Sequence, residues 1–510
     1  MITNIRLENR VIKVEFNDLI NKNTKLKKNF QKVKTKIKSK AIAGITNNSK
    51  NVKKNYLFVA IKGNIKNGND YIDSARKNGS SIIISSEKKG DDIVTIQDIN
   101  MKEVYSLLCS AFYEKKPSNI VGVTGTNGKT SVVEFCRQIW DLSGWKSASM
   151  GTLGTIISGE KTIHSDMQNL TTLDASRLNY ELHELSNKNV THIALEASSH
   201  GLVEKRLEGI NLCGGIFTNL SHDHLDYHNT FENYFEAKKT LFLEHLKPGS
   251  VVAINLDDKF GLRLYEEIKE QPFIFVNYGK HKLANIKILE ANALEKSWQL
   301  KIKYNDAIID VNIGLLGEFQ IYNALASASI CIGLNMDYNF VLKSLSYIKN
   351  ASGRMQIING HPSNALIVID YAHTPDALKK AIEALKLHLK GNIFTLFGCG
   401  GDRDSEKREI MGSIAHSNSN FTIITDDNPR NEPPENIRKN ILKGCPNAIE
   451  IPGRDVAIKK AISLLKKNDI LLIAGKGHET TQTIGKESLP FDDFSAAKLA
   501  IKNLKNEEYE

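Results

Sequence analysis

The stretch from Asn119 to Trp140, which reads NIVGVTGTNGKTSVVEFCRQIW, constrains the fold more than any other part of the sequence. Residues 120–123 form a short apolar run that is typical of a buried strand, and apolar residues then recur at helical spacing from Val132. The glycine-rich loop between them can surround an anion with backbone N–H groups and with the N-terminus of the following helix. The sequence therefore predicts a strand, loop and helix that bind a nucleotide phosphate.

The loop is the first candidate binding site. In P-loops a lysine reaches the outer phosphates and the next hydroxyl holds Mg²⁺, and Lys129 and Thr130 are expected to take these roles. Val123, five positions before Gly128, stands where the common pattern has glycine. A glycine turn without a ligand is the alternative, but the flanking strand and helix favour phosphate binding. The expected nucleotide contacts are Gly125, Thr126, Asn127, Gly128, Lys129, Thr130 and Ser131.

Length and composition indicate a multidomain globular protein. A chain of 510 residues with 41% hydrophobic residues can form about three domains. No apolar run approaches the ~20 residues that span a bilayer, and residues 1–40 lack a signal-peptide core, so we expect a cytoplasmic protein without a membrane span. The six cysteines show no CxxC or Cys/His spacing, which predicts reduced thiols.

The net charge of +10 raises the question of a nucleic-acid partner. The excess lies in residues 22–40, where lysine recurs nearly every second position, and lysine is abundant along the whole chain. Only Phe30 provides an aromatic ring among these basic residues, whereas single-strand binding surfaces interleave several. We expect no nucleic-acid binding, and keep a P-loop NTPase that acts on nucleic acid as the alternative class.

Strand and helix patterns predict three α/β domains, at residues 1–117, 118–351 and 352–510. The first carries a strand at 56–63, a glycine loop at 64–68 and a further strand that begins at Ile82. The central and last domains alternate strands with helices, which favours mainly parallel, doubly wound sheets, the last one Rossmann-like. The expected strands are 120–123, 192–195, 215–218, 251–255 and 273–276, and then 365–369, 393–397, 421–425 and 470–474.

Acidic residues and histidines follow two of the central strands. Glu196 comes directly after strand 192–195, and His222, His224 and His228 come after strand 215–218. Ligands gather at the carboxyl ends of parallel strands, so these groups are expected beside the glycine-rich loop. They suit Mg²⁺, with zinc as the rival; the lack of a nearby thiolate favours the hard cation. A structural salt bridge explains Glu196 alone equally well.

Lys238 lies on a predicted helix with Tyr234, Leu241 and Phe242 on the same face. A lysine among apolar neighbours usually extends its ammonium to solvent. The ordered motifs GTNGKT, EASSH, TNLSHDHLDYH and YFEAK nevertheless resemble the central domain of the Mur ligases. In that family the lysine that matches Lys238 carries a CO₂-derived carbamate, an anionic ligand for Mg²⁺. The ammonium must first lose its proton, which burial assists.

The resemblance implies an ATP-dependent ligase with Lys129, His224 and Lys238 as catalytic residues. It implies that two Mg²⁺ ions are held by Thr130, Glu196, His224 and Lys238. It also implies that Asn323 lies beside adenine, that Asp370 contacts the ribose and that Arg354 approaches the nucleotide from the last domain.

The resemblance further implies that the first substrate is UDP-N-acetylmuramoyl-L-alanyl-D-glutamate, a peptidoglycan precursor. Four residues depart from the family pattern: Leu170 replaces asparagine, Leu173 proline, Glu204 a frequent glutamine and Gln320 asparagine. The matching substrate positions are Asn47, Ser49, Asn64, Ile65, Lys66, Thr171, Thr172, Ser198, Glu204 and Arg206.

The last domain is expected to hold the incoming amino acid. The motif DNPR, which ends at Arg430, resembles the family members that add meso-2,6-diaminopimelate. A guanidinium can pair with the distal carboxylate that distinguishes diaminopimelate from lysine. By the same resemblance, the amino-acid site comprises Arg403, Asp427, Asn428, Pro429, Arg430, Gly475 and Glu479.

The implied reaction forms an amide bond through an acyl phosphate. The lysine-adding ligase of the same family is the alternative within the class, with folylpolyglutamate synthetase more distant. A nucleic-acid NTPase would leave His224, Lys238 and the DNPR loop without a role. Relatives in the family suggest a monomer.

Overall fold

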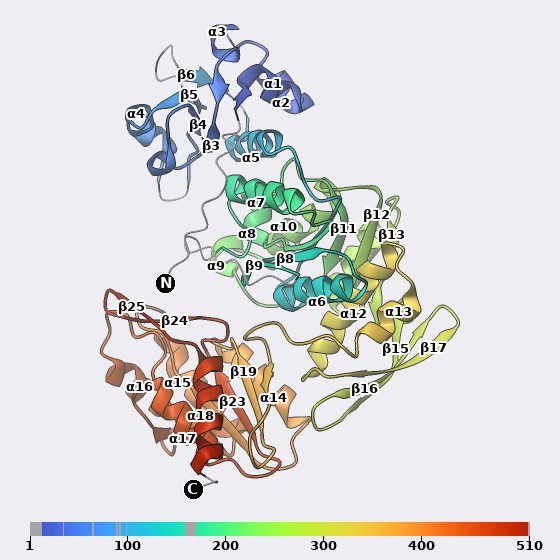
Figure 1. Cartoon of the computed structure of the whole chain (residues 1–510), viewed down its shortest axis with the longest axis vertical. Coiled ribbons are helices and arrows are strands. Elements are labelled where there is room, and N and C mark those ends of the chain that lie inside the picture. Colours follow the sequence, from blue (N-terminus) through green and yellow to red (C-terminus); the bar gives the residue numbers. More distant parts are fainter. Residues whose placement is uncertain are drawn as a thin grey trace.

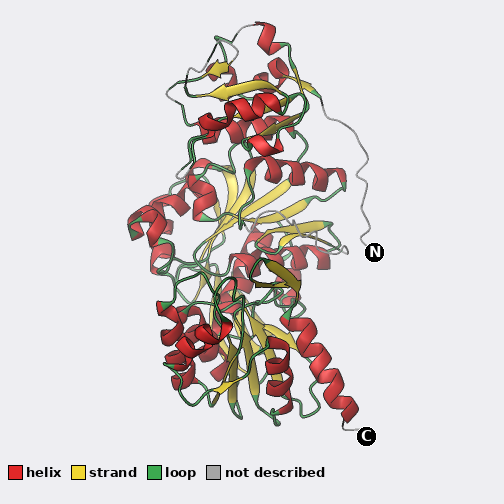
Figure 2. Ribbon diagram, turned by 90° about the vertical axis from the view of Figure 1, so that its left-hand side faces the viewer, coloured by secondary structure: helices red, strands yellow, loops and turns green. Residues whose placement is uncertain are grey.

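The computed structural model describes residues 13–507 apart from residues 34, 64–65, 88–89, 91–92, 98 and 159–169. Three bodies of helix-covered sheet follow one another along the long axis of the molecule, in chain order (Figure 1). We call them the first, central and third units, and the domain boundaries at 117/118 and 351/352 stay predictions. Figure 2 shows helices on the outside of the strands in each unit.

The first unit is a parallel sheet of order β3-β4-β5-β6. Leu57 and Val59 pack against helix α5 in one core, whereas Phe58 packs against α4 in another, so both faces are covered. The strands are β3 (Gly44–Thr46), β4 (Tyr56–Val59), β5 (Ser80–Ser85) and β6 (Ile93–Thr95), with a small pair β1 (Val14–Glu15) and β2 (Ala41–Ile42). The helices are α1 (Phe16–Asn21), α2 (Thr24–Asn29), α3 (Thr35–Lys38), α4 (Ile72–Lys77) and α5 (Met101–Phe112), with 3₁₀ turns η1 (Ser49–Asn51) and η2 (Gly68–Tyr71).

The central unit is built on a sheet of order β13-β12-β11-β7-β10-β8-β9, in which the β8–β9 pairing is antiparallel and the others are parallel. Helices α6 and α12 pack on one face and α7 and α10 on the other. The predicted strands of this unit are thereby confirmed. The strands are β7 (Asn119–Thr124), β8 (Ser147–Gly151), β9 (Gly154–Ile157), β10 (His192–Glu196), β11 (Leu212–Phe217), β12 (Leu246–Ile254) and β13 (Ile274–Phe275). The helices are α6 (Lys129–Leu142), α7 (Ala175–Asn187), α8 (Ser199–Val203), α9 (Leu225–His228), α10 (Phe231–Glu244), α11 (Lys259–Ile268), α12 (Glu318–Gly333) and α13 (Tyr338–Ser344).

Strand β7 lies between β10 and β11, and the chain leaves it first toward one edge of the sheet and later toward the other. The carboxyl end of β7 is therefore a topological switch point, where open α/β sheets bind ligands. The glycine-rich loop follows β7 directly and lies at this point.

A second sheet in the central unit was not predicted. It has the order β14-β15-β16-β17 and is antiparallel from β15 to β17. Its signal is present in the sequence, because WQLKIKY at 298–304 alternates buried apolar residues with more exposed polar ones. The strands are β14 (Tyr278–Gly279), β15 (Ile286–Ala293), β16 (Trp298–Tyr304) and β17 (Ala307–Ile313).

The third unit is a sheet of order β18-β19-β23-β20-β21-β22, parallel except at the β18 edge. Helices α14, α15 and α16 cover one face and α17 and α18 the other, which confirms the doubly wound prediction. The strands are β18 (Gln356–Ile358), β19 (Leu366–Asp370), β20 (Ile393–Phe397), β21 (Phe421–Ile424), β22 (Ile449–Glu450) and β23 (Ile470–Ala474), followed by a hairpin of β24 (Thr481–Ile484) and β25 (Glu487–Pro490). The helices are α14 (Pro375–Lys386), α15 (Glu406–Asn418), α16 (Pro434–Leu442), α17 (Arg454–Ser463) and α18 (Asp493–Glu507).

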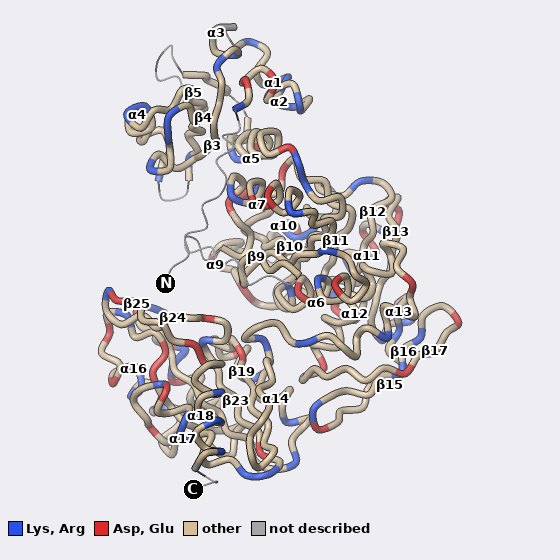
Figure 3. Tube along the Cα trace, in the orientation of Figure 1, with Lys and Arg blue, Asp and Glu red and all other residues tan. Residues whose placement is uncertain are grey.

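Several lysines of the segment 22–40 bond within the first unit. Lys22 pairs with Glu114 at 3.1 Å, Lys25 pairs with Glu103 at 2.6 Å, and Lys40 donates to the Ser81 carbonyl at 2.7 Å. Figure 3 shows basic and acidic residues interspersed along all three units. Among the described residues, no helix combines the length and the apolar character needed to cross a bilayer.

A buried ion pair ties α17 to α18 in the third unit. The Arg454 guanidinium donates to both Asp493 oxygens, at 2.7 and 2.8 Å, and both side chains are fully buried. Asp493→Ala would leave the guanidinium buried without its counter-charge, so we expect a loss of about 3–5 kcal/mol in the free energy of unfolding. Chemical denaturation measures it. Glu290→Ala, which removes an exposed ion pair with Lys301, should change stability little, and equal losses in the two variants would contradict the prediction.

Candidate active site

The glycine-rich loop is held in place by residues that follow β11. Thr126 N donates to the Asn219 carbonyl at 2.8 Å, and Asn127 N donates to Asn219 Oδ1 at 3.0 Å. The Thr218 hydroxyl donates to the Asn127 carbonyl at 2.6 Å. Sequence reasoning assigned no role to Thr218 or Asn219, although their position at a strand end was the available signal. The two strand ends therefore shape the loop together.

Two lysines converge on one carbonyl of this loop. Lys129 Nζ donates to the Gly125 carbonyl at 2.9 Å and to the Thr126 carbonyl at 2.8 Å. Lys238 Nζ donates to the same Gly125 carbonyl at 2.8 Å and lies 4.4 Å from the ring centroid of Tyr234. Lys238 is fully buried, which corrects the snorkelling alternative.

The electrostatics of the two lysines favour an anion. Burial lowers the pKa of Lys129, and burial together with the charge of Lys129 lowers the pKa of Lys238 well below its usual range. Like charges repel more strongly where water is scarce. A phosphate or another anion next to the Gly125 carbonyl would relieve this repulsion.

Glu196 ends β10 opposite Val123 of β7, which sets it beside the loop. Its carboxylate is 2% exposed and accepts from Thr152 N at 2.8 Å and from the Thr152 hydroxyl at 3.3 Å. Among the described residues it forms no ion pair, so the salt-bridge alternative is not supported. Burial lowers the pKa of Lys129, and the negative charge of Glu196 offsets part of that shift. Thr130, in the first turn of α6, is also buried.

His224 precedes α9 with a left-handed backbone (φ 51°), and its ring lies 3.5 Å from an oxygen of Asp223. Burial lowers the pKa of His224, and the charges of Lys129 and Lys238 lower it further. The imidazole is therefore close enough to both lysines to interact with them. The His200 ring, which sequence reasoning left without a role, packs edge-on against it at 4.9 Å between centroids.

The remaining histidines of this loop face other partners. His228 is buried, bonds to the Ser199 hydroxyl at 2.9 Å and stacks on Tyr234, whereas His222 packs near Phe231. Helix α9 has one turn, and successive side chains along a helical turn point in different directions. In the part of the chain that the structure describes, this loop brings no three His, Cys, Asp or Glu ligand atoms within 4.8 Å of one another.

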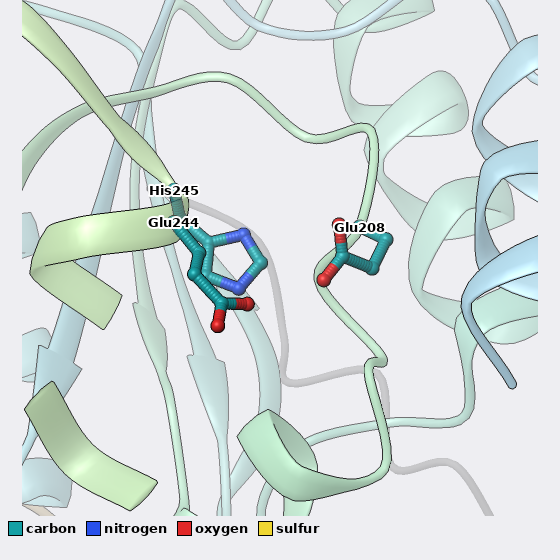
Figure 4. A group of neighbouring side chains, drawn as sticks. All are labelled: Glu208, Glu244 and His245. Atoms are coloured by element: carbon teal, nitrogen blue, oxygen red, sulfur yellow. The ribbon is translucent and has the colours of Figure 1, made fainter. Parts of the chain in front are cut away.

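A different group of potential metal ligands lies away from the loop. Glu208, Glu244 and His245 bring their ligand atoms within 4.8 Å of one another (Figure 4). Lys205 lies 3.6 Å from Glu208 and forms a shorter ion pair with Glu244. Burial lowers the pKa of His245 to about 4, so its ring is neutral at pH 7. Because Lys205 pairs with both carboxylates and offsets part of their charge, we interpret this group as a salt-bridge network.

Asn323 and Arg354 approach the loop from two other segments. A Cβ on Gly128 would collide with the Asn323 side-chain amide, which donates to Gln320 Oε1 at 2.8 Å. The charge of Arg354, from the third unit, adds to burial in lowering the pKa of Lys129. Arg354 Nε is buried and has no hydrogen-bond partner among the described residues. This donor is therefore available to a polar ligand.

Asp370 is the last residue of β19 and lies near Arg354. It accepts from Met355 N at 2.8 Å. Burial raises the pKa of Asp370, and the charge of Arg354 opposes that rise. The Arg354 guanidinium lies 4.9 Å from the ring centroid of Tyr371. The charge of Arg354 therefore acts on both Asp370 and Lys129.

Residues predicted for the first substrate gather where the first and central units meet. A cavity of about 110 Å³ is lined by Asn47, Glu204 and Arg206, among others. Arg206 donates to the Thr172 carbonyl at 2.6 Å, and the Thr172 hydroxyl lies 2.9 Å from the Ser198 hydroxyl and donates to the Glu196 carbonyl at 2.8 Å. This network connects the cavity with the end of β10.

The other described positions predicted for the first substrate do not line the cavity. The Thr171 hydroxyl accepts from the Thr152 hydroxyl at 3.3 Å, which brings it near Glu196. Ser49 is buried and Lys66 is exposed. Leu173, where the family pattern has proline, is buried in the core beneath α7. Asn64 and Ile65 lie outside the described residues.

Part of the predicted amino-acid site assembles at the ends of β21 and β23. Asn428 donates to Glu479 Oε2 at 2.8 Å, and a Cβ on Gly475 would lie 2.8 Å from an oxygen of Asp427. Lys476 is fully buried and donates to Glu479 at 3.0 Å and to Asn428 at 3.2 Å. Sequence reasoning missed this lysine, which holds Glu479 in place.

Arg430 and Arg403 approach each other across Gly400. A Cβ on Gly400 would lie 2.7 Å from Arg430 Nη1 and 3.8 Å from Arg403 Cγ. Arg430 also donates to the Gly401 carbonyl at 2.8 Å, and its backbone N–H donates to Thr483 of β24 at 3.0 Å. Pro429 precedes it and accepts from Glu432 N at 3.1 Å. Neither guanidinium forms an ion pair with any described residue, so both remain available to a carboxylate.

Gly125→Ala tests the loop geometry. Gly125 has φ 143°, and a Cβ there would meet the Thr218 hydroxyl and lie 3.1 Å from Asn219 N. We expect binding of ATP with Mg²⁺ to weaken by at least about tenfold in isothermal titration calorimetry. Gly144→Ala is the matched control, since Gly144 also has a positive φ of 85° but no heavy atom within 4 Å of its Cβ. Equal affinities of the two variants would contradict the account.

Comparison with known proteins extends these observations to the whole chain. Family models match residues 41–113 (Mur ligase family, catalytic domain), 123–331 (Mur ligase middle domain) and 353–477 (Mur ligase, glutamate ligase domain). Two curated relatives are named UDP-N-acetylmuramoyl-L-alanyl-D-glutamate--2,6-diaminopimelate ligase. The protein from Bradyrhizobium diazoefficiens is 39% identical over 464 residues, which cover 90% of this chain and 95% of the relative. The protein from Rickettsia bellii is 40% identical over 475 residues, which cover 90% of this chain and 96% of the relative.

Solved structures agree with this result. A structure of a UDP-N-acetylmuramoyl-L-alanyl-D-glutamate--2,6-diaminopimelate ligase has a TM-score of 0.71 at 31% identity and covers 96% of this chain and 99% of its own. The MurF ligase from Thermotoga maritima in complex with ADP has a TM-score of 0.58 at 19% identity, covers 91% and 98%, and shows a shared fold. Because identity of this extent runs through all three units, the chain belongs to the Mur ligase family.

Proposed function

We propose that the protein ligates meso-2,6-diaminopimelate to the D-glutamate γ-carboxylate of UDP-N-acetylmuramoyl-L-alanyl-D-glutamate, driven by ATP, in peptidoglycan precursor synthesis. The observation that carries this proposal is the convergence of Lys129 and Lys238 on the Gly125 carbonyl, beside the Glu196 carboxylate. Such a site favours a polyanion together with a cation. Relatives that are 39% and 40% identical over 90% of the chain carry the name of this activity.

The proposed reaction has two steps. The D-glutamate γ-carboxylate attacks the γ-phosphorus of ATP, which forms an acyl phosphate and releases ADP. A deprotonated amine of diaminopimelate then attacks the acyl carbon, and inorganic phosphate leaves as the amide bond forms. Lys129 stabilises the negative charge on the transferring phosphoryl group, and the backbone N–H groups of residues 125–131 orient the triphosphate.

The donor set suits Mg²⁺, because the Glu196 carboxylate is buried and forms no ion pair with a described residue, and Thr130, at the start of α6, is buried as well. Two ions would be held by Thr130, Glu196, His224 and the carbamate of Lys238. When bound, Mg²⁺ neutralises phosphate charge. Glu196 itself is oriented by its two hydrogen bonds from Thr152.

We assign a carbamate to Lys238. The neutral amine, favoured by burial, attacks CO₂, forms a C–N bond and releases a proton, which leaves an anionic carboxylate on Nζ. The carbamate places a negative charge next to Lys129, where a protonated Lys238 would place a second positive one. It therefore relieves the repulsion by Lys129.

The remaining ligand contacts follow the positions of the side chains. Asn323 lies against Gly128 and is assigned to adenine, and Asp370 to the ribose. The orphaned Arg354 Nε is assigned to the nucleotide phosphates. The junction between the first and central units is assigned to the nucleotide sugar through Asn47, Ser49, Asn64, Ile65, Lys66, Thr171, Thr172, Ser198, Glu204 and Arg206.

The third unit is assigned to the amino acid. Arg403 and Arg430 approach each other without an ion pair among the described residues, and two guanidiniums suit the distal carboxylate of diaminopimelate. L-Lysine lacks that carboxylate, so the lysine-adding alternative is not favoured. The other contacts assigned to this substrate are Asp427, Asn428, Pro429, Gly475 and Glu479.

We further propose that the enzyme acts as a monomer in the cytoplasm, where ATP is available, and binds no nucleic acid. The lysine-rich segment supports the last point, because Lys22, Lys25 and Lys40 bond within the first unit. Basic residues committed to such contacts offer little to phosphates.

Lys238→Ala tests the carbamate. We expect the variant to lose ligase activity, measured as ADP release with both substrates, and added formate or acetate to restore part of it by supplying the missing carboxylate. Lys239→Ala is the matched control, because Lys239 lies on the same helix but pairs with Glu236 and Glu267. Full activity of Lys238→Ala without added anion would refute the carbamate role.

Arg430→Ala tests the amino-acid assignment. Loss of a charge-assisted contact to the distal carboxylate should raise the KM for meso-diaminopimelate by roughly 10–100-fold, with the KM for ATP unchanged. L-Lysine is the control substrate, because the variant should lose most of the preference for diaminopimelate over lysine. An unchanged preference would remove Arg430 from the site.

A further inference from the structure

Lys102, to which no sequence motif drew attention, bridges the first and central units. Its Nζ lies 2.7 Å from Glu204 Oε1, and the two residues are 102 positions apart in the chain. The side chains are 24% and 28% exposed, so the pair is largely shielded from solvent. Asn100 caps the start of α5 and accepts from Lys102 N at 3.0 Å, which orients the first turn of the helix.

Both residues line the 110 Å³ cavity at the junction, with Asp174 and Arg206 as the other charged residues of its wall. The wall thus carries two positive and two negative groups. Asp174 Oδ1 accepts from the Tyr105 hydroxyl at 2.8 Å and from Ser176 N at 3.0 Å, so two hydrogen bonds hold this carboxylate in place.

Arg206 is the cation that this arrangement leaves available. It donates to the Thr172 carbonyl at 2.6 Å and forms no ion pair among the described residues. Glu204 is two residues away and accepts from Lys102 and, at 3.2 Å, from the Tyr227 hydroxyl. Without Lys102, the Glu204 carboxylate would lack its counter-charge, compete for Arg206 and repel an anionic ligand.

We infer that Lys102 is a positioning residue for binding of the anionic nucleotide-sugar substrate, because it neutralises Glu204 and so keeps Arg206 free to bind an anionic group. This inference rests on the proposed function, which assigns the cavity to UDP-N-acetylmuramoyl-L-alanyl-D-glutamate. Lys102 acts through Glu204 and need not touch the substrate. The affinity for this ligand should therefore follow the net charge of the four wall groups.

Three variants and a control test this charge dependence by isothermal titration with UDP-N-acetylmuramoyl-L-alanyl-D-glutamate. Lys102→Met gives the wall a net charge of about −1 and should weaken binding by roughly tenfold. Glu204→Gln keeps an oxygen acceptor for Tyr227, makes the wall positive, and should bind more tightly than the parent protein. The double variant returns the wall to neutrality and should bind within about threefold of the parent.

Lys25→Met is the matched control, because Lys25 pairs with Glu103 of the same helix at 2.6 Å but does not line the cavity. It should leave the affinity unchanged, and none of the variants should alter the KM for ATP.

A double variant as weak as Lys102→Met would mean that Lys102 contacts the substrate itself, and would overturn the inference. Unchanged binding by Lys102→Met would overturn it as well. A parent protein that fails to bind the nucleotide sugar would overturn the proposed function too, whereas the other two outcomes leave that function intact.

Discussion

Two ammonium groups that share the carbonyl oxygen of Gly125 determine the character of this site. Lys129 and Lys238 both donate to that oxygen, and Lys238 is fully buried. Burial and the charge of Lys129 lower the pKa of Lys238, while the packed faces of the central sheet hold both lysines on helices α6 and α10. The lysine pair therefore explains why the site suits a triphosphate and why Lys238 is suited to become a carbamate.

The fold brings the other components to this point. Strand β7 ends between β10 and β11, so Glu196 and the Asn219 turn lie on either side of the glycine-rich loop. Arg354 reaches the loop from the third unit, and the Thr172 network runs from Glu196 toward the first unit. Residues of the central and third units thus lie near the loop, and the Thr172 network extends from there to the cavity that the first and central units share.

Local pattern predicted the strand, loop and helix around residues 119–140 because apolar periodicity and glycine placement act over a few residues. It did not predict the burial of Lys238; pattern alone favoured a solvent-exposed ammonium, and only the resemblance to Mur ligases indicated otherwise.

The histidines after β11 lie within seven residues of one another, but one turn of helix directs His228 to the core and leaves His224 exposed. The Lys102–Glu204 pair joins segments 102 residues apart, a contact that tertiary packing decides. The sheet at 278–313 was not predicted although residues 298–304 alternate in polarity, because one alternating run does not show which strands it pairs with.

The most direct test of the central claim is the rate of ADP release by the intact protein under defined substrate combinations. The account predicts rapid release only when ATP, Mg²⁺, UDP-N-acetylmuramoyl-L-alanyl-D-glutamate and meso-diaminopimelate are all present, with one amide product formed for each ADP. L-Lysine in place of diaminopimelate should support little turnover. Release stimulated by DNA or RNA, and not by the muramoyl dipeptide, would contradict the account.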